Sequence, residues 1–225
     1  MKKTAVLSIC FVLCLLSNAT YAAVELKTDK QKLSYALGAY YSLGIKQQNI
    51  ELDIPIFLQA VEDSLKKAPL QMTQSDMELV LNQYKEKLAS ERVSVASANK
   101  TASQKFLETN KTKPGVVTLP SGLQYKIIRN STGAKPSGDN KVKVHYKGTL
   151  IDGKVFDSSY DRGEPVTFNI SQVIKGWQEV LPLMTVGSKW QAYIPPDLAY
   201  GERGAGEAIP PNSALIFDIE LIGIN

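Results

Sequence analysis

The chain has 225 residues, enough for one large domain or two small ones. It carries 26 Lys and Arg residues against 22 Asp and Glu residues, a formal net charge of +4. This mild excess does not favour binding to nucleic acid or to an anionic membrane. The lone histidine, His145, excludes zinc sites built from His and Cys and argues against a Ser-His-Asp triad. We therefore expect a function that needs no metal, no cofactor and no covalent nucleophile.

The first 22 residues have the pattern of a secretory signal peptide. A basic start (Met1–Lys3) precedes an apolar run (Ala5–Leu16), and Thr20–Ala22 fits a small-residue cleavage site. The run is too short for a stable membrane anchor, so no transmembrane span is expected. Both cysteines lie within this segment, so the mature chain would form no disulfide. Cleavage would also remove Lys2 and Lys3 and leave a net charge of +2.

Residues 27–67 show the pattern of two short helices. Thr28 followed by Gln31 is a capping-box pattern at the start of the first helix. The second helix is predicted to begin near Asp53, with Pro55 in its first turn, and to end before Pro69. Apolar residues recur at helical spacing in both: Leu33, Leu37 and Tyr40 in the first, and Phe57, Val61 and Leu65 in the second.

A much longer helix is predicted to follow. Thr73 with Asp76 marks its start, and no Gly or Pro occurs between Leu70 and Lys113. A helix over most of this stretch would be about 55 Å long. Its first half carries an apolar stripe, which thins beyond Leu88: Met77, Leu81, Tyr84 and Leu88, then Val95, Ala102 and Phe106. We expect the first half to bury its stripe and the second half to be a solvent-exposed stalk.

The helical part is a thin core for a monomer, because it offers two small helices and half of an apolar stripe. Pairing of two copies would cover these faces, so the sequence favours a homodimer. A compact three-helix bundle within one chain is the alternative.

The hydrophobic period changes from helical to two after Pro114–Gly115. Alternation runs through residues 123–127 and 142–146, with turn-forming clusters between the runs, and Asp152–Gly153 is a hairpin signal. One short helix is expected around residues 175–181. The predicted fold class is therefore α+β, an antiparallel sheet packed against one helix, preceded by an all-α segment and a long connecting helix.

Residues 140–221 hold a series of motifs in fixed order: Val142-Lys-Val-His-Tyr146-Lys-Gly, Val155-Phe-Asp157-Ser-Ser159, Val173-Ile174-Lys-Gly-Trp177, Ala199-Tyr200-Gly201, Ile209-Pro-Pro211 and Leu215-Ile-Phe217-Asp218. Together they resemble the FKBP family of peptidyl-prolyl cis/trans isomerases. The helical segment, the long helix and the stretches Thr28–Tyr35 and Lys113–Tyr125 resemble the macrophage infectivity potentiator (Mip) subgroup of that family.

The resemblance covers nearly the whole mature chain and implies four segments. These are a signal peptide (1–22), a helical dimerisation domain (23–70), a long connecting helix (71–112) and an FKBP-type isomerase domain (113–225). The break at Pro114–Gly115 predicts that residues 113–225 fold and isomerise short peptides on their own.

The resemblance also implies the site. Asp157 and Tyr200 would be the catalytic residues, with Tyr200 directing its hydroxyl at a substrate carbonyl and Asp157 accepting a hydrogen bond from Tyr146. Trp177 would form the floor under the substrate proline, and the Ile174 N–H would hold a second carbonyl. The full set of substrate-binding residues is Tyr146, Phe156, Val166, Val173, Ile174, Trp177, Ile209 and Phe217. No metal or cofactor is implied.

Single residues of this set have simpler explanations. An isolated Trp177 is typical of a core, and Asp157 before two serines is typical of a turn cap. The complete set in order favours the site. His145 lies in an alternating run and is interpreted as a structural strand residue. Val166 stands where many family members have an aromatic residue, which bears on substrate preference and on affinity for the macrolides that inhibit the family.

The function implied is an isomerase that assists the folding of proline-containing unfolded or exported polypeptides. Its place would be the periplasm or the outer-membrane surface of a Gram-negative bacterium, and the Mip resemblance adds an association with virulence. A non-catalytic holdase chaperone and a surface binding module are the alternatives. A holdase should suppress aggregation of a proline-free client equally well.

Overall fold

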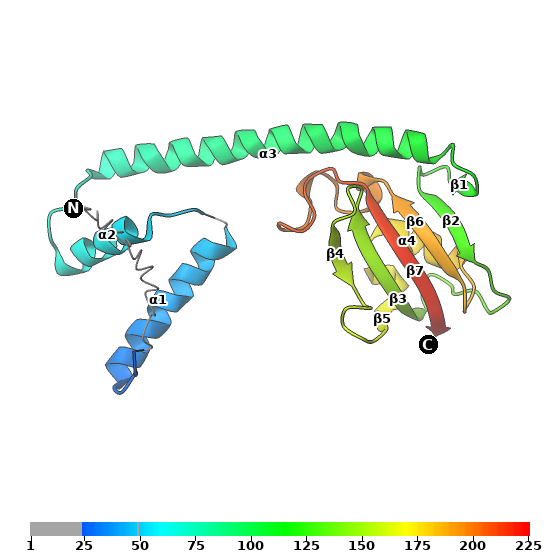
Figure 1. The fold of residues 1–225 in the computed structure, drawn as a ribbon, viewed down its shortest axis with the longest axis horizontal. Coiled ribbons are helices and arrows are strands. Elements are labelled where there is room, and N and C mark those ends of the chain that lie inside the picture. The colour runs from blue at the N-terminus through cyan, green and yellow to red at the C-terminus, as the bar shows by residue number, and fades with distance from the viewer. Residues whose placement is uncertain (1–23, 49) are drawn as a thin grey trace, which may run out of the picture. The chain divides into compact units, whose positions relative to one another are not determined.

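The structure is a computed structural model that describes residues 24–48 and 50–225. The predicted signal peptide lies outside the described residues. Contacts divide the chain into two compact units, with the boundary between Gln71 and Met72 (Figure 1). The long helix therefore belongs to the same unit as the C-terminal sheet.

The first unit contains the two predicted helices, α1 (Asp29–Gln47) and α2 (Ile54–Lys66). The Thr28 side chain accepts from the Gln31 N–H, and the Gln31 side chain accepts from the Thr28 N–H, so the predicted capping box is present. Asp53 caps α2 by accepting from Ile56 N–H. No residue of α1 or α2 is buried, and large apolar side chains such as Leu33 and Tyr40 are exposed.

The second unit begins with α3 (Gln74–Asn110), a helix of 37 residues. Thr73 and Asp76, the predicted start signal, form a capping box at its N-terminus. The helix runs without a break because its sequence has neither Gly nor Pro, as Figure 1 shows.

An antiparallel seven-stranded sheet follows, in the order β1-β2-β6-β7-β3-β4, with β5 also paired to β3. The strands are β1 (Val116–Thr118), β2 (Gln124–Arg129), β3 (Lys141–Leu150), β4 (Val155–Ser158), β5 (Val166–Asn169), β6 (Lys189–Ile194) and β7 (Leu215–Ile224). Between them lie α4 (Lys175–Val180) and the short 3-10 helices η1 (Ile170–Gln172), η2 (Leu181–Leu183), η3 (Pro196–Leu198) and η4 (Gly201–Arg203). The predicted α+β class is confirmed.

The core lies between one face of the sheet and α4. Alternate residues of β3 face it, and these are Val142, Val144, Tyr146, Gly148 and Leu150. Trp177 and Val180 of α4 pack against the same cluster. Gly176 lets the helix approach β6 closely, because a Cβ there would lie 2.5 Å from Ile194 Cγ2.

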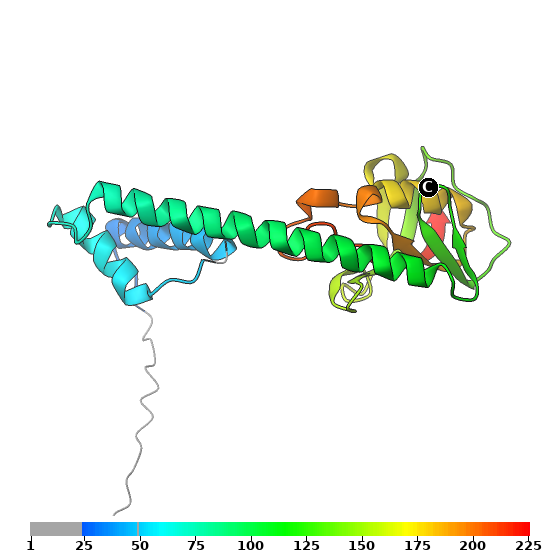
Figure 2. The ribbon, with the colours of Figure 1, turned by 90° about the horizontal axis from the view of Figure 1, so that it is seen from above.

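The second half of α3 is docked on the sheet domain, so the expectation of a solvent-exposed stalk is wrong for residues 92–110. Ser103 is 1% exposed and Asn110 is fully buried. Asn110 Nδ2 donates to Gln124 Oε1 at 2.9 Å, and Gln124 Nε2 donates to the Leu107 carbonyl at 2.8 Å. Figure 2 shows this end of α3 beside the sheet.

The docking face escaped the sequence analysis because much of it is polar. Most of its less exposed residues recur every three or four positions, at Ala96, Asn99, Ser103, Phe106 and Asn110, and Leu107 lies beside Phe106. A search for apolar stripes detects only Phe106 among the large side chains of this series. Its ring lies 6.0 Å from that of Tyr193 on β6.

Within the described ranges, 24–48 and 50–225, no helix combines the length and the apolar composition needed to cross a membrane.

Candidate active site

A cavity of about 350 Å³ opens between β3, β4, β7, α4 and the loop after η3. Its lining is aromatic and aliphatic with few polar groups, as expected for a site that takes a small apolar group. The lining residues are Tyr146, Phe156, Asp157, Phe168, Gln172, Val173, Ile174, Trp177, Tyr200 and Phe217.

Trp177 lies in the first turns of α4 and is 3% exposed. Three rings meet it edge to face: Tyr146 at 5.3 Å, Phe168 at 5.6 Å and Phe217 at 5.3 Å between ring centres. Aromatic pairs favour such arrangements, each by about 0.5–1.5 kcal/mol beyond simple burial. The indole is therefore held rigidly among the rings that line the cavity.

Gly148 makes room for the aromatic wall. It lies opposite Phe217 on β7 and Asp157 on β4. A Cβ at this position would lie 2.5 Å from Phe156 Cζ and 2.9 Å from Phe217 Cε1. Any larger residue would push these two rings, which pack edge to face at 5.5 Å.

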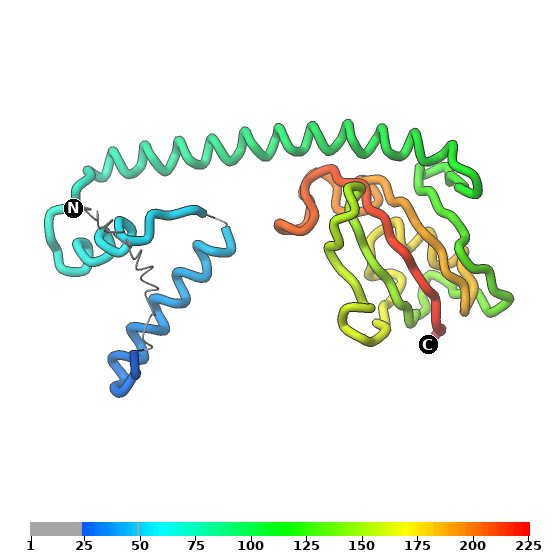
Figure 3. The backbone as a smooth tube through the Cα atoms, in the orientation of Figure 1, coloured from blue at the N-terminus to red at the C-terminus, as the bar shows by residue number. Residues whose placement is uncertain are grey.

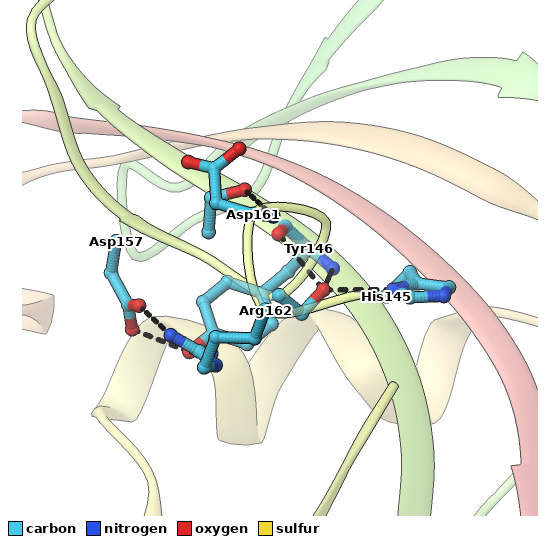
Figure 4. Close-up of polar contacts among 7 residues, drawn as sticks. His145, Tyr146, Asp157, Asp161 and Arg162 are labelled. Carbon is cyan, nitrogen blue, oxygen red and sulfur yellow. Dashed lines mark hydrogen bonds and ion pairs between the residues drawn. The ribbon is translucent and has the colours of Figure 1, made fainter. Parts of the chain in front are cut away.

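The polar end of the cavity is a three-residue network (Figure 4). The Tyr146 hydroxyl donates to Asp157 Oδ2, which is the contact predicted from the family resemblance. Arg162 then donates to both partners, through Nη1 to Asp157 Oδ1 at 2.5 Å and through Nη2 to Tyr146 Oη at 2.8 Å. The guanidinium carbon also lies 5.6 Å from the centre of the Tyr146 ring. The Tyr146 hydroxyl is thus fully engaged as donor and acceptor.

This network fixes the charge state of Asp157. Partial burial alone would raise the pKa of the carboxyl, but hydrogen bonds from Tyr146 and Arg162 outweigh it and hold the pKa below the ordinary range. Burial, with the hydrogen bond to Asp157, raises the pKa of Tyr146. The carboxylate is therefore ionised and the phenol neutral at physiological pH.

Tyr200 is the second phenol in the cavity and is 40% exposed. Its hydroxyl has no hydrogen-bond partner among the residues that the structure describes. Burial, and to a lesser extent the negative charge of Asp157, raise the pKa of Tyr200. The hydroxyl therefore keeps its proton and remains a hydrogen-bond donor.

The structure brings together eight of the ten expected site residues around this cavity: Tyr146, Phe156, Asp157, Val173, Ile174, Trp177, Tyr200 and Phe217. Val166 and Ile209 are not among the lining residues. Val166 pairs with Val144 on β3 and packs partly buried against the core. Ile209 is 5% exposed and pairs with Ala205 in the loop between β6 and β7.

Three site residues were missed by the sequence analysis. Phe168 follows Val166 by two positions, so strand alternation places both on one face and could have identified it. Gln172 lies in η1, just before the Val173–Ile174 pair. Arg162 lies in the loop between β4 and β5, and no local pattern indicates its contact with Asp157.

His145 is placed outside the cavity. Its Nδ1 lies 2.9 Å from Ser159 Oγ, and its ring stacks on Tyr160 at 4.6 Å. Ser159 in turn accepts from Tyr146 N–H at 2.8 Å. These contacts agree with the structural interpretation of His145 as a residue that helps to fix the turn after β4.

The antiparallel sheet with one helix across its face, and the aromatic cavity between them, define an FKBP-type domain. Residues 132–222 match the sequence model described as FKBP-type peptidyl-prolyl cis-trans isomerase. Residues 30–127 match the model described as the domain amino terminal to that isomerase.

Individual proteins match over most of the chain. The outer membrane protein MIP of Legionella longbeachae is 47% identical over 90% of this chain and 88% of its own. The peptidyl-prolyl cis-trans isomerase Mip of Coxiella burnetii is 42% identical over 93% of both. The crystal structure of FkpA from Escherichia coli superposes with a TM-score of 0.63 at 36% identity, covering 89% of this chain and 99% of that one. The chain belongs to the FKBP-type peptidyl-prolyl cis-trans isomerases and is similar to their Mip and FkpA members.

Proposed function

We propose that this isomerase acts on proline-containing unfolded polypeptides during or after export, with Asp157 and Tyr200 as its catalytic residues. The observation that supports it most directly is the cavity. Beside its apolar floor lies the Tyr200 hydroxyl, which has no hydrogen-bond partner within residues 24–48 and 50–225. The remaining polar groups at that end are already paired with one another.

The chemistry requires a change of environment rather than a bond-breaking step. Rotation about the peptide C–N bond faces a barrier of about 18–20 kcal/mol, because resonance gives that bond double-bond character. The planar amide is more charge-separated than the twisted transition state, so an apolar cavity disfavours the planar form relative to the twisted one. An acceleration of ~10⁵ corresponds to lowering the barrier by ~7 kcal/mol.

Trp177 forms the floor on which the substrate proline ring packs, with Phe168, Phe217 and Val173 around it. Burial of a ring of ~100 Å² contributes ~2.5 kcal/mol at most. The rigid edge-to-face rings around Trp177 keep this surface in place, so little ordering is needed when the substrate binds.

Tyr200 donates its hydroxyl to the substrate carbonyl, and the Ile174 N–H holds a second carbonyl. Ile174 is the N-cap residue of α4, a position whose N–H is not used within the helix. Asp157 holds the Tyr146 hydroxyl and Arg162, and its negative charge opposes ionisation of Tyr200. Asp157 thus fixes the positions of the Tyr146 and Arg162 side chains at the polar end of the cavity.

The first unit serves as the dimerisation element of this proposal. Large apolar side chains on α1 and α2 are exposed: Leu33 by 61%, Leu37 by 48% and Val61 by 41%. A second copy of the chain would cover them, as the sequence predicted. The predicted signal peptide and the similarity to an outer membrane protein support export to the periplasm or outer-membrane surface. Family macrolides are candidate inhibitors of the same cavity.

A protease-coupled isomerase assay on the mature chain, residues 23–225, tests the proposal. We expect catalysed cis-to-trans conversion of short Xaa-Pro peptides and faster refolding of a client limited by proline isomerisation. Absence of both, with aggregation of a proline-free client still suppressed, would replace the isomerase with the holdase.

A further inference from the structure

The loop between β6 and β7, residues 195–214, carries Tyr200 and Ile209. Residues 210–212, near its end, offer few backbone hydrogen-bond donors. Pro210 and Pro211 lack an N–H, and Asn212 adopts a left-handed backbone with φ 55°, which is uncommon for a residue other than glycine. Within the loop, the Asn212 N–H donates to the Gly201 carbonyl and the Ser213 hydroxyl to the Pro210 carbonyl, and contacts from another element add to this order.

Those contacts come from α3. Asn99 Nδ2 donates to the Pro211 carbonyl at 2.9 Å. Ser103 Oγ donates to the Asn212 carbonyl at 2.9 Å and accepts from the Ala214 N–H at 2.8 Å. Ser103 is 1% exposed, so it replaces water for both backbone groups.

Two further hydrogen bonds join the loop and α3, one donated by the loop and one donated by the helix. Asn212 Nδ2 donates to the Ala96 carbonyl of α3 at 3.2 Å. Arg92 Nη2 donates to the Arg203 carbonyl, in η4, at 2.9 Å. Figure 3 shows the orange and red segment that leads into β7 passing under α3. The helix therefore fixes this loop at both its middle and its end.

A short covalent and hydrogen-bonded path links Ser103 to the cavity. The Asn212 N–H donates to the Gly201 carbonyl at 2.8 Å, and Gly201 directly follows Tyr200. Ala205 and Ile209 exchange backbone hydrogen bonds of 2.7 and 3.2 Å and close the loop between these points. A shift of Asn212 would therefore be passed to Tyr200 through a single backbone hydrogen bond.

We propose that Asn99 and Ser103 of α3 are positioning residues of the isomerase, which set the place of the Tyr200 hydroxyl through Asn212. This inference rests on the role of Tyr200 proposed above. Neither residue lines the cavity, so their effect is exerted through the loop. The long helix is then part of the catalytic unit as well as a connection to the first unit.

The test uses Asn99→Ala and Ser103→Ala in the mature chain. We expect kcat/KM for short Xaa-Pro peptides to fall by about three- to tenfold, since small displacements of a catalytic group are costly. Amide hydrogen exchange at Ala205, Ile209 and Asn212 should become faster in both variants. Asn110→Ala is the matched control, because Asn110 is equally buried on the same helix but contacts Gln124 of β2. It should lose stability without a change in loop exchange or in kcat/KM.

A double-mutant cycle with Tyr200→Phe separates positioning from general weakening of the fold. In the Tyr200→Phe background, Ser103→Ala should reduce kcat/KM by less than about twofold, because the hydroxyl it positions is absent. An undiminished effect in that background, or loop exchange no faster than in Asn110→Ala, would overturn the inference. Parent activity in Tyr200→Phe alone would refute the role of Tyr200. Parent activity in Ser103→Ala beside an impaired Tyr200→Phe would refute the role of α3.

Discussion

Arg162 donates a hydrogen bond of 2.8 Å to the hydroxyl of Tyr146, from a loop sixteen residues further along the chain. That hydroxyl also donates to Asp157, so both of its hydrogen-bonding roles are used within the protein. The consequence concerns Tyr200, whose hydroxyl is the phenol in the cavity with no such partner among the described residues. A substrate carbonyl that accepts a hydrogen bond from a phenol in this cavity would therefore accept it from Tyr200.

Tyr200→Phe should therefore lower kcat/KM by about three- to tenfold, the worth of one hydrogen bond of about 1 kcal/mol. Stability should change little, because the Tyr200 hydroxyl makes no hydrogen bond to the residues that the structure describes. Tyr160→Phe is a matched control, since Tyr160 is 41% exposed against 40% for Tyr200 but lies outside the cavity. Steady-state isomerase kinetics with thermal melts would measure both. Equal activity of the two variants would remove Tyr200 from the mechanism.

Asp157→Leu should reduce kcat/KM by about tenfold or more, because two hydrogen-bonding groups at the rim lose their shared acceptor. The Tyr146 hydroxyl would lose the acceptor for its proton and could compete with Tyr200 as a donor to the substrate carbonyl. Asp161→Leu, four residues away and exposed, is the control and should keep the parent rate. If Asp157→Leu also isomerises at the parent rate, the carboxylate is merely a cap for the turn at Ser158–Ser159.

Activity should be nearly constant from about pH 5 to pH 9. Hydrogen bonds outweigh burial at Asp157 and lower its pKa, while burial raises the pKa of Tyr200 and of Tyr146, so none of the three changes charge in this range. The stability that ionised Asp157 contributes is present above the ordinary carboxyl pKa and is lost as pH falls through its lowered folded pKa. A protease-free exchange measurement by NMR would show the plateau. A transition within this range would mean that a group other than these three controls the activity.

Local rules predicted the elements well. The caps Thr28, Asp53 and Thr73 and the missing helix breakers before Pro114 each act within a few residues, so their signals survive in a single sequence. The family resemblance predicted most of the cavity residues equally well. The sequence did not predict contacts between segments that are distant along the chain. Arg162 and Ser103 contact partners that only the tertiary fold brings near them. In the sequence, polar residues at helical spacing look the same whether they face solvent or the backbone of another segment.

The docked half of α3 changes what is expected of fragments. A fragment of residues 113–225 lacks the donors to Pro211 and Asn212 and the acceptor for Ala214, whereas a fragment of residues 90–225 keeps them. The shorter fragment should be less stable by about 2–4 kcal/mol, from several hydrogen bonds of about 1 kcal/mol each. Urea unfolding of the two would measure this difference. Equal midpoints would mean that α3 contributes nothing to the isomerase domain.

Two copies of the chain are expected to assemble through α1 and α2 of the first unit. Leu37 and Val61 are half-exposed apolar residues on α1 and α2, helices in which no residue is buried. If a second copy covers them, Leu37→Glu and Val61→Glu would each place an unpaired charge in an apolar interface and dissociate the dimer. Val117→Glu is the matched control, because Val117 on β1 is 43% exposed but belongs to the isomerase domain.

Sedimentation equilibrium at several concentrations should give the dimer mass for the parent and for Val117→Glu, and the monomer mass for the two helix variants. Short-peptide kcat/KM should be the same in all four, since each cavity is built from one chain. Long unfolded clients should be handled less well by the monomers, because such clients reach the helical half. A monomer mass for the parent would refute the dimer. A dimer that persists after deletion of residues 23–75 would place the interface outside α1 and α2.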